Sequence, residues 1–241
     1  MIKQLRRFIS PFFLTRYYLT LHLKEVLSET RIKGSILDIG CGNKPYEFYF
    51  KDANKYVGID FKSYSKNKDM GYNPPDYYFD SNYLKSLDLP FKKESFDNCV
   101  SFQVLEHHAN PQKLISEMYR VTKKGGHILL TAPFLGGVHE EPNDYQRFTK
   151  YGLIEIFKPY KCKIISIKEQ GSLFSTISLM LNEYLNSFAS KNRVNYFISL
   201  LIYPPFILFS YISLVLDIFF KSNKIFFNYL ILVKKWINYL R

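Results

Sequence analysis

Two glycines and a nearby aspartate carry the clearest chemical signal in this sequence. Ser35–Ile39 is apolar and short enough to form a buried strand, and Gly40 and Gly42 follow it directly. Because glycine has no side chain, it lets the backbone turn sharply and approach a ligand closely. Asp38 lies two residues before the first glycine. We therefore predict a strand, a tight turn and a ligand site within residues 35–50.

Two further aspartates stand at the ends of the next two predicted strands. Asp60 ends the strand Tyr56–Asp60, and Asp80 ends the strand Tyr77–Asp80. The carboxyl ends of neighbouring parallel strands face one crevice, where a carboxylate can accept hydrogen bonds from both ribose hydroxyls. Asp60 is placed for such a ribose, and Asp80 for an adenine amino group. A site for a nucleoside-containing ligand explains this pattern better than the alternative, in which the aspartates are three unrelated loop or cap residues.

The turn does not fit a dinucleotide. A dinucleotide site holds its pyrophosphate with backbone amides at a helix N-terminus, and its fingerprint has a third glycine. Pro45 replaces that glycine here. A nicotinamide-dependent oxidoreductase, the first alternative enzyme class, is therefore not favoured.

The three cysteines predict neither a disulfide framework nor a metal site. Cys41, Cys99 and Cys162 lie far apart and have no paired Cys/His spacing. Free thiols of this kind suit a reducing cytoplasm. We expect no metal ion, and a cytoplasmic protein.

Short apolar runs alternate with helical patterns through the middle of the chain, which is typical of a parallel sheet with crossover helices. Further strands are predicted at Asn98–Phe102, at His127–Ala132, near Lys163–Lys168 and at Phe226–Val233. A short helix is predicted near Tyr151–Phe157. The predicted fold class is α/β: a Rossmann-like three-layer sandwich with a seven-stranded, mainly parallel sheet and an antiparallel last strand.

One crossover helix has clear ends in the sequence. Asn110 can cap its start, Pro111 suits its first turn, Lys123 and Lys124 complement its carboxyl end, and Gly125 can adopt a left-handed stop. Its apolar residues recur at helical spacing: Leu114, Ile115, Met118 and Val121.

These motifs, in this order, resemble a class I S-adenosylmethionine-dependent methyltransferase of the small-molecule type. The resemblance covers about residues 33–170. It rests on Ile36–Gly42, Val57–Asp60, Leu89–Phe91, Ser95–Phe96–Asp97, Gln103–His107, Met118–Val121 and Gly125–Gly126. S-adenosylmethionine carries a sulfonium and an α-amino group and no phosphate, so an acidic residue beside the turn is chemically sensible. The resemblance implies this cofactor and a methyl-transfer reaction.

The resemblance also implies which residues bind the cofactor. They are Asp38, Gly40, Cys41 and Gly42 around the methionine part, Asp60 at the ribose, Asp80 near the adenine, and Gln103 and Val104 beneath the pocket. Asp80 departs from the pattern, because more residues separate it from Leu89 than is usual in the family. Glu106 and His107 are implied to be a mainly structural pair at the edge of the pocket.

The loop after the predicted strand His127–Ala132 is the candidate substrate loop. Residues 139–149 resemble a His-Glu-x-Pro-x-Asp-x-x-Arg-Phe/Tyr-Thr pattern found in one branch of these enzymes. His139 is the candidate catalytic base for a hydroxyl acceptor, because imidazole titrates near neutral pH. The other residues assigned to the loop site are Asp144, Tyr145 and Arg147. In the alternative interpretation, His139, Asp144 and Arg147 form a salt-bridged scaffold.

A hydrophobic insertion precedes the last predicted strand. Residues 171–224 exceed what a compact sheet requires. Within them, Tyr196–Phe220 is apolar, with Asp217 as its single charged residue, and Pro204 and Pro205 lie near its middle. The length suits a bilayer, but two prolines are expected to break a straight helix. A helical hairpin in one leaflet, a transmembrane segment and a buried subdomain or dimer interface all remain open.

Charge and aromatic content favour a membrane surface as partner. The chain has 241 residues, a net charge of +12 and 18% aromatic residues. Near the start, Lys3, Arg6 and Arg7 alternate with large apolar residues, a composition suited to a headgroup layer. Nucleic acid is not expected as a substrate. Residues 73–76 resemble the Asn-Pro-Pro-aromatic motif of nucleic-acid methylases, but Asp76 is not aromatic and the motif precedes the third predicted strand.

The sequence thus predicts a cytoplasmic methyltransferase attached to the inner face of a membrane. The expected reaction is O-methylation of a small or lipid-linked acceptor, such as a glycolipid or an isoprenoid. The predicted domains are 1–32, a basic and aromatic helical segment; 33–170, the cofactor-binding core; 171–224, the hydrophobic helical insertion; and 225–241, the closing strand and tail. The alternative is a non-catalytic membrane adaptor with a vestigial cofactor domain.

Overall fold

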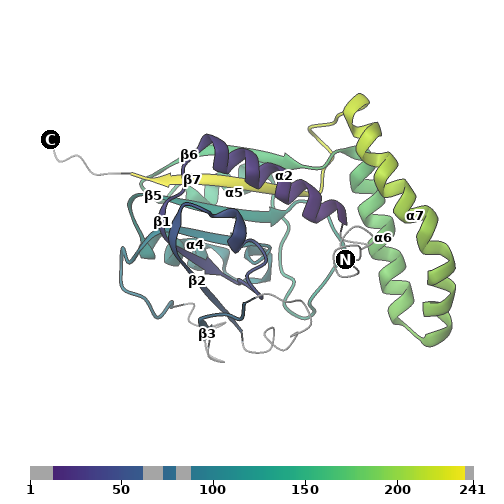
Figure 1. Ribbon diagram of the computed structural model, residues 1–241, viewed down its shortest axis with the longest axis horizontal. Helices are drawn as coiled ribbons and strands as arrows, with labels where there is room; N and C mark the ends of the chain where they lie inside the picture. Colours follow the sequence, from purple (N-terminus) through teal and green to yellow (C-terminus); the bar gives the residue numbers. More distant parts are fainter. Residues whose placement is uncertain (1–12, 62–72, 80–87, 237–241) are drawn as a thin grey trace. The chain divides into compact units, whose positions relative to one another are not determined.

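The computed structural model describes residues 13–61, 73–79 and 88–236. Its strands are β1 (Gly34–Ile39), β2 (Ala53–Phe61), β3 (Tyr77–Phe79), β4 (Phe96–Phe102), β5 (Thr122–Pro133), β6 (Cys162–Gln170) and β7 (Asn228–Lys235). Its helices are α2 (Phe13–Glu29), α4 (Pro111–Val121), α5 (Lys150–Phe157), α6 (Leu173–Ser190) and α7 (Arg193–Phe219), with short 3₁₀ turns η1 (Glu47–Tyr49) and η4 (Leu105–His107) (Figure 1). Of the predicted N-terminal segment, residues 1–12 lie outside the described residues.

The strands form one seven-stranded sheet in the order β3-β2-β1-β4-β5-β7-β6. The pairs β1–β2, β1–β4, β2–β3 and β4–β5 are all parallel. The order reverses between β1 and β4, so the carboxyl ends of these strands lie at the switch point where open α/β folds bind ligands. The predicted fold class, a Rossmann-like and mostly parallel sheet, is confirmed.

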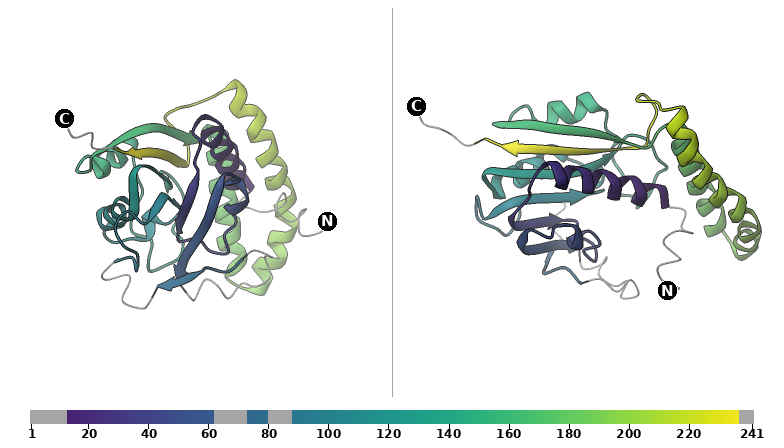
Figure 2. Two further views of the ribbon diagram at one scale, coloured as in Figure 1. Left: turned by 60° about the vertical axis from the view of Figure 1, so that its left-hand side comes forward. Right: turned by 45° about the horizontal axis from the view of Figure 1, so that its top comes forward.

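The last strand runs antiparallel to β6. Phe227 N donates to Gln170 O at 3.2 Å, and Trp236 N donates to Lys161 O at 3.0 Å. The residue numbers rise on one strand as they fall on the other, which defines antiparallel pairing. The two arrows point in opposite directions in Figure 2. The strand itself begins at Asn228 and ends at Lys235, two residues later at each end than the sequence predicted.

The central strands are apolar because both of their faces are covered. Ile36, Leu37 and Ile39 of β1 are each fully buried, as are Cys99 and Val100 of β4. Strands of a parallel sheet covered on both sides carry continuous apolar runs instead of alternating ones. These apolar runs bury β1 and β4 in the core. Apart from the aspartate in β1, the candidate site residues near these two strands follow them in the chain.

The crossover helix α4 begins as predicted and ends earlier. Asn110 Oδ1 accepts a hydrogen bond from Lys113 N at 3.2 Å, so the predicted cap is confirmed. The helix ends at Val121, and the next residue already belongs to β5. Gly125 has a φ of 81°, but it lies inside the strand, so the predicted helix stop at Gly125 is wrong. Thr122 pairs with Phe96 across the sheet, and this pairing ends the helix before the lysines.

The hydrophobic insertion forms two long helices, α6 and α7, that lie side by side (Figures 1 and 2). The expected break at Pro204 and Pro205 is wrong, because α7 runs through both residues as one helix. Each proline removes one helical hydrogen bond, at a cost of about 3 kcal/mol. Packing along α6 holds the helix on both sides of the prolines, since Ser199 and Ser210 are both buried.

The described residues divide into two compact units. The first contains residues 13–22, Pro133–His139 and Glu169–Tyr229, and it includes the helical hairpin α6–α7. The second contains the remainder, including β1 to β4, α4 and α5. The residues predicted to bind the cofactor all belong to the second unit, apart from Asp80, which lies outside the described residues.

Candidate cofactor site and substrate loop

The predicted glycine turn forms at the end of β1. Gly40 N and Cys41 N both donate to Ile59 O of β2, at 2.9 and 3.3 Å. Gly40 has a φ of 70° and Gly42 a φ of 52°, backbone conformations that residues with side chains rarely adopt. The two glycines are therefore required by the backbone itself, and β2 fixes the turn that they make.

The two glycines differ in what surrounds them. A Cβ atom added to Gly40 would lie 2.2 Å from Val104 Cγ2, so the end of β4 packs directly against the turn. A Cβ added to Gly42 would have no heavy atom within 4 Å among the described residues. Open space thus lies in front of Gly42, and Val104 closes the turn behind Gly40. This is the cradle that a ligand held by backbone atoms requires.

Asp60 is held in place by two backbone amides. Gly42 N donates to its Oδ2 atom, and Phe61 N donates to its Oδ1 atom at 2.6 Å. The residue is buried, and this burial raises the pKa of the Asp60 carboxyl, although the two amides oppose the shift. A carboxylate accepts more hydrogen bonds than these two. Its geometry therefore suits the ribose hydroxyls that the sequence assigned to it.

Asp38 is the most deeply buried acid of the site. Tyr56 OH donates to its Oδ2 atom at 2.7 Å, whereas no hydrogen-bond partner reaches its Oδ1 atom from the described part of the chain. Burial raises the pKa of the Asp38 carboxyl to about 8, with the Tyr56 hydrogen bond opposing the shift. An unsatisfied buried oxygen beside a ligand turn is what a cationic amino group would pair with.

The other cofactor residues contribute in different ways. Cys41 Sγ would lie 2.5 Å from a Cβ atom at Gly58, so the thiol packs into β2 and only the backbone of Cys41 belongs to the turn. Gln103 has a φ of 56°, and its backbone and side-chain nitrogens both donate to Thr131 Oγ1 at 2.9 Å. Its assigned place beneath the pocket remains a prediction. Asp80 lies outside the described residues.

A second charged pair supports the turn, and no sequence pattern predicts it. Lys44 Nζ lies 2.6 Å from Asp76 Oδ2, and Gly58 N donates to the same oxygen at 2.7 Å. The Lys44 side chain is buried, so this pair ties the turn to the chain before β3. Asp76 belongs to the segment that resembled a nucleic-acid methylase motif, and here it is a structural residue. The two residues are 32 positions apart, and no local pattern connects them.

The substrate loop contains a rigid ion pair. Arg147 donates to both carboxylate oxygens of Asp144, at 2.6 and 2.8 Å, in the bidentate geometry that guanidinium and carboxylate prefer. The Asp144 side chain is buried. The Asp144–Arg147 pair agrees with one part of the alternative interpretation, whereas the place of His139 in a scaffold stays a prediction. Tyr145 is half exposed. His139 is also exposed, and its Nδ1 lies 3.1 Å from Gly137 O.

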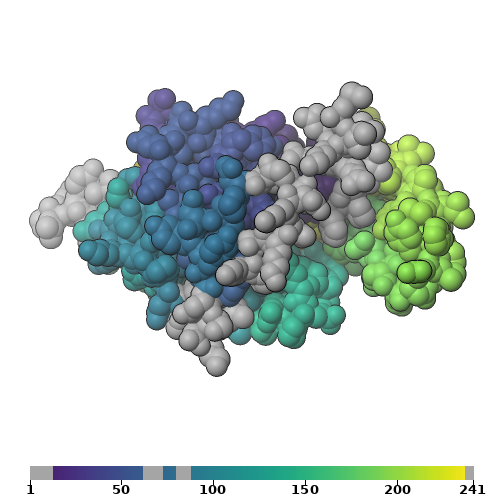
Figure 3. All heavy atoms as spheres, turned by 60° about the horizontal axis from the view of Figure 1, so that its bottom comes forward, coloured from purple at the N-terminus to yellow at the C-terminus, as the bar shows by residue number. Residues whose placement is uncertain are grey.

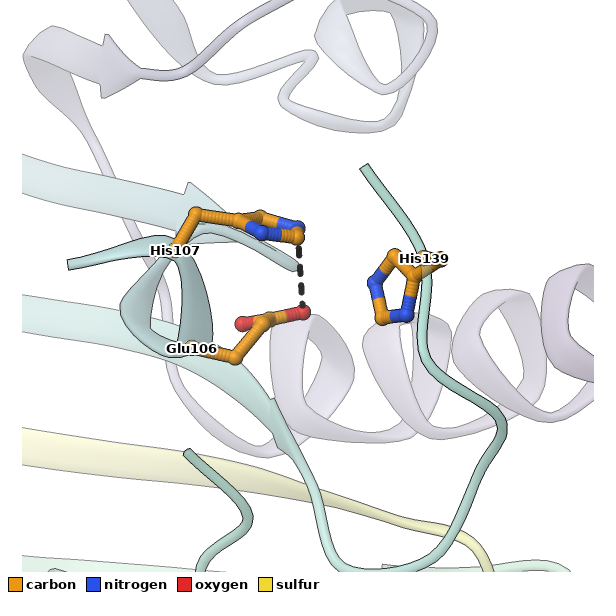
Figure 4. Close-up of side chains that lie close together, drawn as sticks. All are labelled: Glu106, His107 and His139. Atoms are coloured by element: carbon orange, nitrogen blue, oxygen red, sulfur yellow. Dashed lines mark ion pairs between the residues drawn. The ribbon is translucent and has the colours of Figure 1, made fainter. Parts of the chain in front are cut away.

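Two residues after Val104, the 3₁₀ turn η4 places Glu106 and His107 side by side (Figure 4). Glu106 is completely buried, and burial raises the pKa of its carboxyl to about 8. Its main-chain oxygen accepts a hydrogen bond from Tyr145 N at 3.0 Å, which joins η4 to the substrate loop. The pair thus lies between the end of β4 and that loop, as a pocket-edge pair would.

Comparison with known proteins finds a methyltransferase domain in this chain. Residues 37–130 match the family model of the methyltransferase domain known as Methyltransf_11. An uncharacterized protein of Methanocaldococcus jannaschii is 34% identical over 130 residues, 52% of this chain and 60% of that protein. An uncharacterized methyltransferase of Mycobacterium tuberculosis is 32% identical over 108 residues, 43% of this chain and 41% of that protein. The matched segments thus span 60% or less of these two relatives.

Solved structures share the fold at low sequence identity. A candidate methyltransferase of Bacillus halodurans has a TM-score of 0.56 and 15% identity, and the match covers 89% of this chain and 99% of that one. The cyclase SpnF has a TM-score of 0.55 and 16% identity, with 90% and 81% covered. Since a cyclase shares the fold, the fold alone does not identify the reaction. Residues 37–130 carry the methyltransferase domain, and the chain around them has the Rossmann-like fold of these structures.

The buried Asp38 carboxyl predicts that cofactor binding depends on pH. With a pKa raised by burial to about 8, this carboxyl is mostly protonated near neutral pH. Pairing with the ligand's ammonium group should therefore release a proton. We expect the affinity for S-adenosylhomocysteine to rise roughly tenfold per pH unit between pH 6 and 7.5. Calorimetric titration in buffers of different ionisation enthalpy measures both the affinity and the released proton.

Asp38→Asn is the matched control for this dependence, because an amide oxygen can still accept the Tyr56 hydrogen bond. It should flatten the pH dependence and remove the released proton. The pH dependence of folding stability has the opposite sign to that of cofactor affinity. The folded-state pKa lies above the unfolded value, so this group's contribution to stability falls as pH rises from about 4 to about 8. An affinity that does not change with pH would contradict the assigned role of Asp38.

Proposed function

We propose that this protein transfers a methyl group from S-adenosylmethionine to an oxygen atom of a lipid-linked or lipid-soluble acceptor, at the inner face of a membrane. The cofactor part is supported most directly by the open cradle at Gly42, flanked by the oriented carboxylate of Asp60 and the unsatisfied oxygen of Asp38. The backbone of the turn and the buried oxygen of Asp38 match the amino acid end of this cofactor. The Asp60 carboxylate matches its ribose.

The residues mainly have to position the reactants. The acceptor oxygen attacks the methyl carbon as the carbon–sulfur bond breaks, and sulfur keeps the electron pair as a neutral thioether. Such a displacement depends chiefly on holding the two reactants in line. The acceptor hydroxyl loses its proton to a base, and His139 is our candidate because it is exposed on the substrate loop.

One experiment tests the reaction and the acceptor class together. Membrane extract is incubated with the protein and S-adenosylmethionine labelled in the methyl group. We expect label in the organic phase after lipid extraction, and none when the Gly40→Ala variant is used. Label only in the aqueous phase would contradict a lipid acceptor. No label in either phase, together with no binding of S-adenosylhomocysteine, would favour the non-catalytic adaptor.

The membrane part of the proposal is supported by the inverted polarity of the hairpin α6–α7. The buried residues of α7 are polar: Ser199, Ser210, Ser213 and Asp217. Ser178 and Asn182 of α6 both hydrogen-bond to Ser210 Oγ at 2.9 Å. Small polar residues between helices and apolar residues outside are typical of helices whose solvent is lipid. A helix pair built for water would have the reverse arrangement.

The exposed residues of α7 are almost all apolar, and the helix is the yellow-green surface in Figure 3. Its most exposed residues include Leu201, Ile218 and Phe219, at 81%, 75% and 74% exposure. The helix is long and apolar enough to cross a membrane by length and composition. A helix whose exposed side is apolar over its whole length requires a nonpolar partner. A bilayer fits best, because exposed cations flank the helix at both ends and anionic headgroups would attract them: Lys191, Arg193, Lys221 and Lys224.

Both ends of the hairpin are fastened together at its base. Ser222 N donates to Ser172 Oγ at 2.6 Å, just before α6 and just after α7. Asp217 accepts hydrogen bonds from Phe174 N and Ser175 N, at 2.9 and 3.1 Å, and so binds the first turn of α6. Lys221 and Lys224 lie near this base, whereas Lys191 and Arg193 lie at the opposite end of the hairpin. Both ends can meet the headgroups if α7 lies along the cytoplasmic face of the membrane with its apolar side in the lipid.

Liposome flotation tests whether the hairpin attaches the protein to a membrane. The protein should float with vesicles that contain anionic phosphatidylglycerol. The double variant Leu201→Glu, Leu208→Glu should remain at the bottom of the gradient, because each exposed leucine contributes about 1.5–3 kcal/mol when buried in hydrocarbon. Tyr151→Glu is the matched control, since Tyr151 is 77% exposed on α5 and should not affect flotation.

Two outcomes would contradict membrane attachment. One is a wild-type protein that stays soluble and monomeric without detergent. The other is a soluble dimer, detected by light scattering, that the leucine substitutions dissociate. In the second case α7 would be an interface between two copies of the chain.

A further inference from the structure

Glu106 is a buried carboxyl whose oxygens lack hydrogen-bond partners. Its exposure is 0%, and neither Oε1 nor Oε2 receives a hydrogen bond from the described residues. A buried carboxyl of this kind is costly unless a charge or a ligand compensates it. It lies at the end of β4, two residues after the valine that packs on Gly40. A structural role alone does not account for it.

His107 faces Glu106 with a fixed ring orientation. Its Nδ1 atom lies 2.8 Å from Asn143 O. A carbonyl oxygen only accepts, so Nδ1 carries the hydrogen, and Nε2 of the neutral ring keeps its lone pair. Nε2 lies 3.9 Å from Glu106 Oε1, the pair marked in Figure 4, and 3.8 Å from Glu140 Oε2. A backbone carbonyl that orients a histidine through its other nitrogen is typical of metal ligands.

Both distances are measured from His107 Nε2, and each suits a pair of ligands on one ion. They exceed hydrogen-bond length, which ends near 3.2 Å. Ligand atoms about 2.0–2.2 Å from a common ion lie roughly 3–4 Å from one another. We propose that Glu106, His107 and Glu140 bind a divalent metal ion. The sequence predicted no metal, since three residues from two separate segments form no recognisable spacing.

The ligand set indicates the kind of ion and what it would do. Two carboxylates and one imidazole suit Mn²⁺ or Zn²⁺ better than Ca²⁺, which prefers six or more oxygen atoms. The bound ion would act as a Lewis acid on the acceptor hydroxyl, since it lowers the pKa of a coordinated oxygen. The hydroxyl proton still leaves to a base, and the oxygen then forms the new bond to the methyl carbon. This assignment builds on the proposed function.

Metal binding is tested on the full chain without any substrate. Electron paramagnetic resonance measures the free Mn²⁺ that remains as metal-free protein is added, and calorimetry measures Zn²⁺. We expect one bound ion per chain with a Kd in the micromolar range, and a Kd at least tenfold higher for Glu106→Gln. Glu140→Gln is a second variant with the same expected direction, and its side chain is partly exposed, so folding is less at risk.

The controls separate this proposal from the proposed function. Glu141→Gln removes an exposed carboxylate beside the site and should leave metal affinity unchanged. S-adenosylhomocysteine should bind both glutamine variants as it binds the wild type. Failure of either ion to bind, or equal affinity in Glu106→Gln and the wild type, would overturn the metal site. Methyl transfer from S-adenosylmethionine could still stand in that case.

Discussion

Replacement of Gly40 by alanine is expected to abolish cofactor binding and to destabilise the protein. The φ of 70° costs an alanine about 1–2 kcal/mol. Its Cβ would also lie 2.2 Å from Val104 Cγ2, and overpacking of this kind costs about 1–3 kcal/mol. The turn must shift to relieve the contact, and a shift of an ångström can lower binding or rate roughly 100-fold.

The neighbouring glycine provides a matched comparison. Gly42→Ala carries a similar backbone cost, but its Cβ extends into open space. It should therefore lower the melting temperature less than Gly40→Ala and still weaken S-adenosylhomocysteine binding, because the methyl group occupies the cradle. Thermal unfolding and calorimetric titration measure the two effects separately.

A second substitution tests the mechanism of the Gly40 effect. Val104→Ala removes both γ carbons that a Cβ at residue 40 would meet, and leaves Val104 Cβ at 3.3 Å. The double variant Gly40→Ala, Val104→Ala should recover part of the lost stability, relative to Val104→Ala alone. The same substitution should not rescue Gly42→Ala. Equal rescue of both variants would show that contact with Val104 is not the reason Gly40 is required.

This part of the site was predictable because its signals are local. The apolar run of β1, the two glycines and the acid at the end of β2 lie within 26 residues, and each constrains its own backbone. A buried parallel sheet also needs long apolar runs, so the strands followed from the same pattern, whereas their order in the sheet did not. Boundaries were less certain: a pairing between Thr122 and Phe96, not the lysines, decided where α4 ends.

The remaining features depend on residues distant in the sequence. Tyr56 hydrogen-bonds to Asp38, and Lys44 pairs with Asp76, across 18 and 32 positions. The prolines of α7 are tolerated because a neighbouring helix packs along both halves. The same packing hides the polar side of α7, which no hydropathy pattern distinguished from its outer side. Side-chain partners of this kind are set by tertiary structure, and composition alone cannot supply them.

Replacement of His139 by alanine is expected to lower kcat by 100-fold or more and to leave the affinity for S-adenosylhomocysteine unchanged. General base catalysis typically contributes about 10²–10⁴-fold. The cofactor residues lie in segments that the substitution does not touch, so binding should persist. The imidazole is exposed, which makes a folding defect an unlikely source of the loss. Single-turnover rates measure the chemical step directly, and calorimetry measures binding.

This test must distinguish a catalytic role of His139 from a role in the fold of the loop. Arg147 and Asp144 satisfy one another through two hydrogen bonds, so loss of His139 leaves that pair intact. Val138→Ala, at an adjacent and 72% exposed position, is the control for loop perturbation and should keep its activity. Imidazole added to His139→Ala should restore part of the rate if the side chain accepts a proton. A slow variant that imidazole cannot rescue would make His139 a positioning residue, and unchanged turnover would remove it from the mechanism altogether.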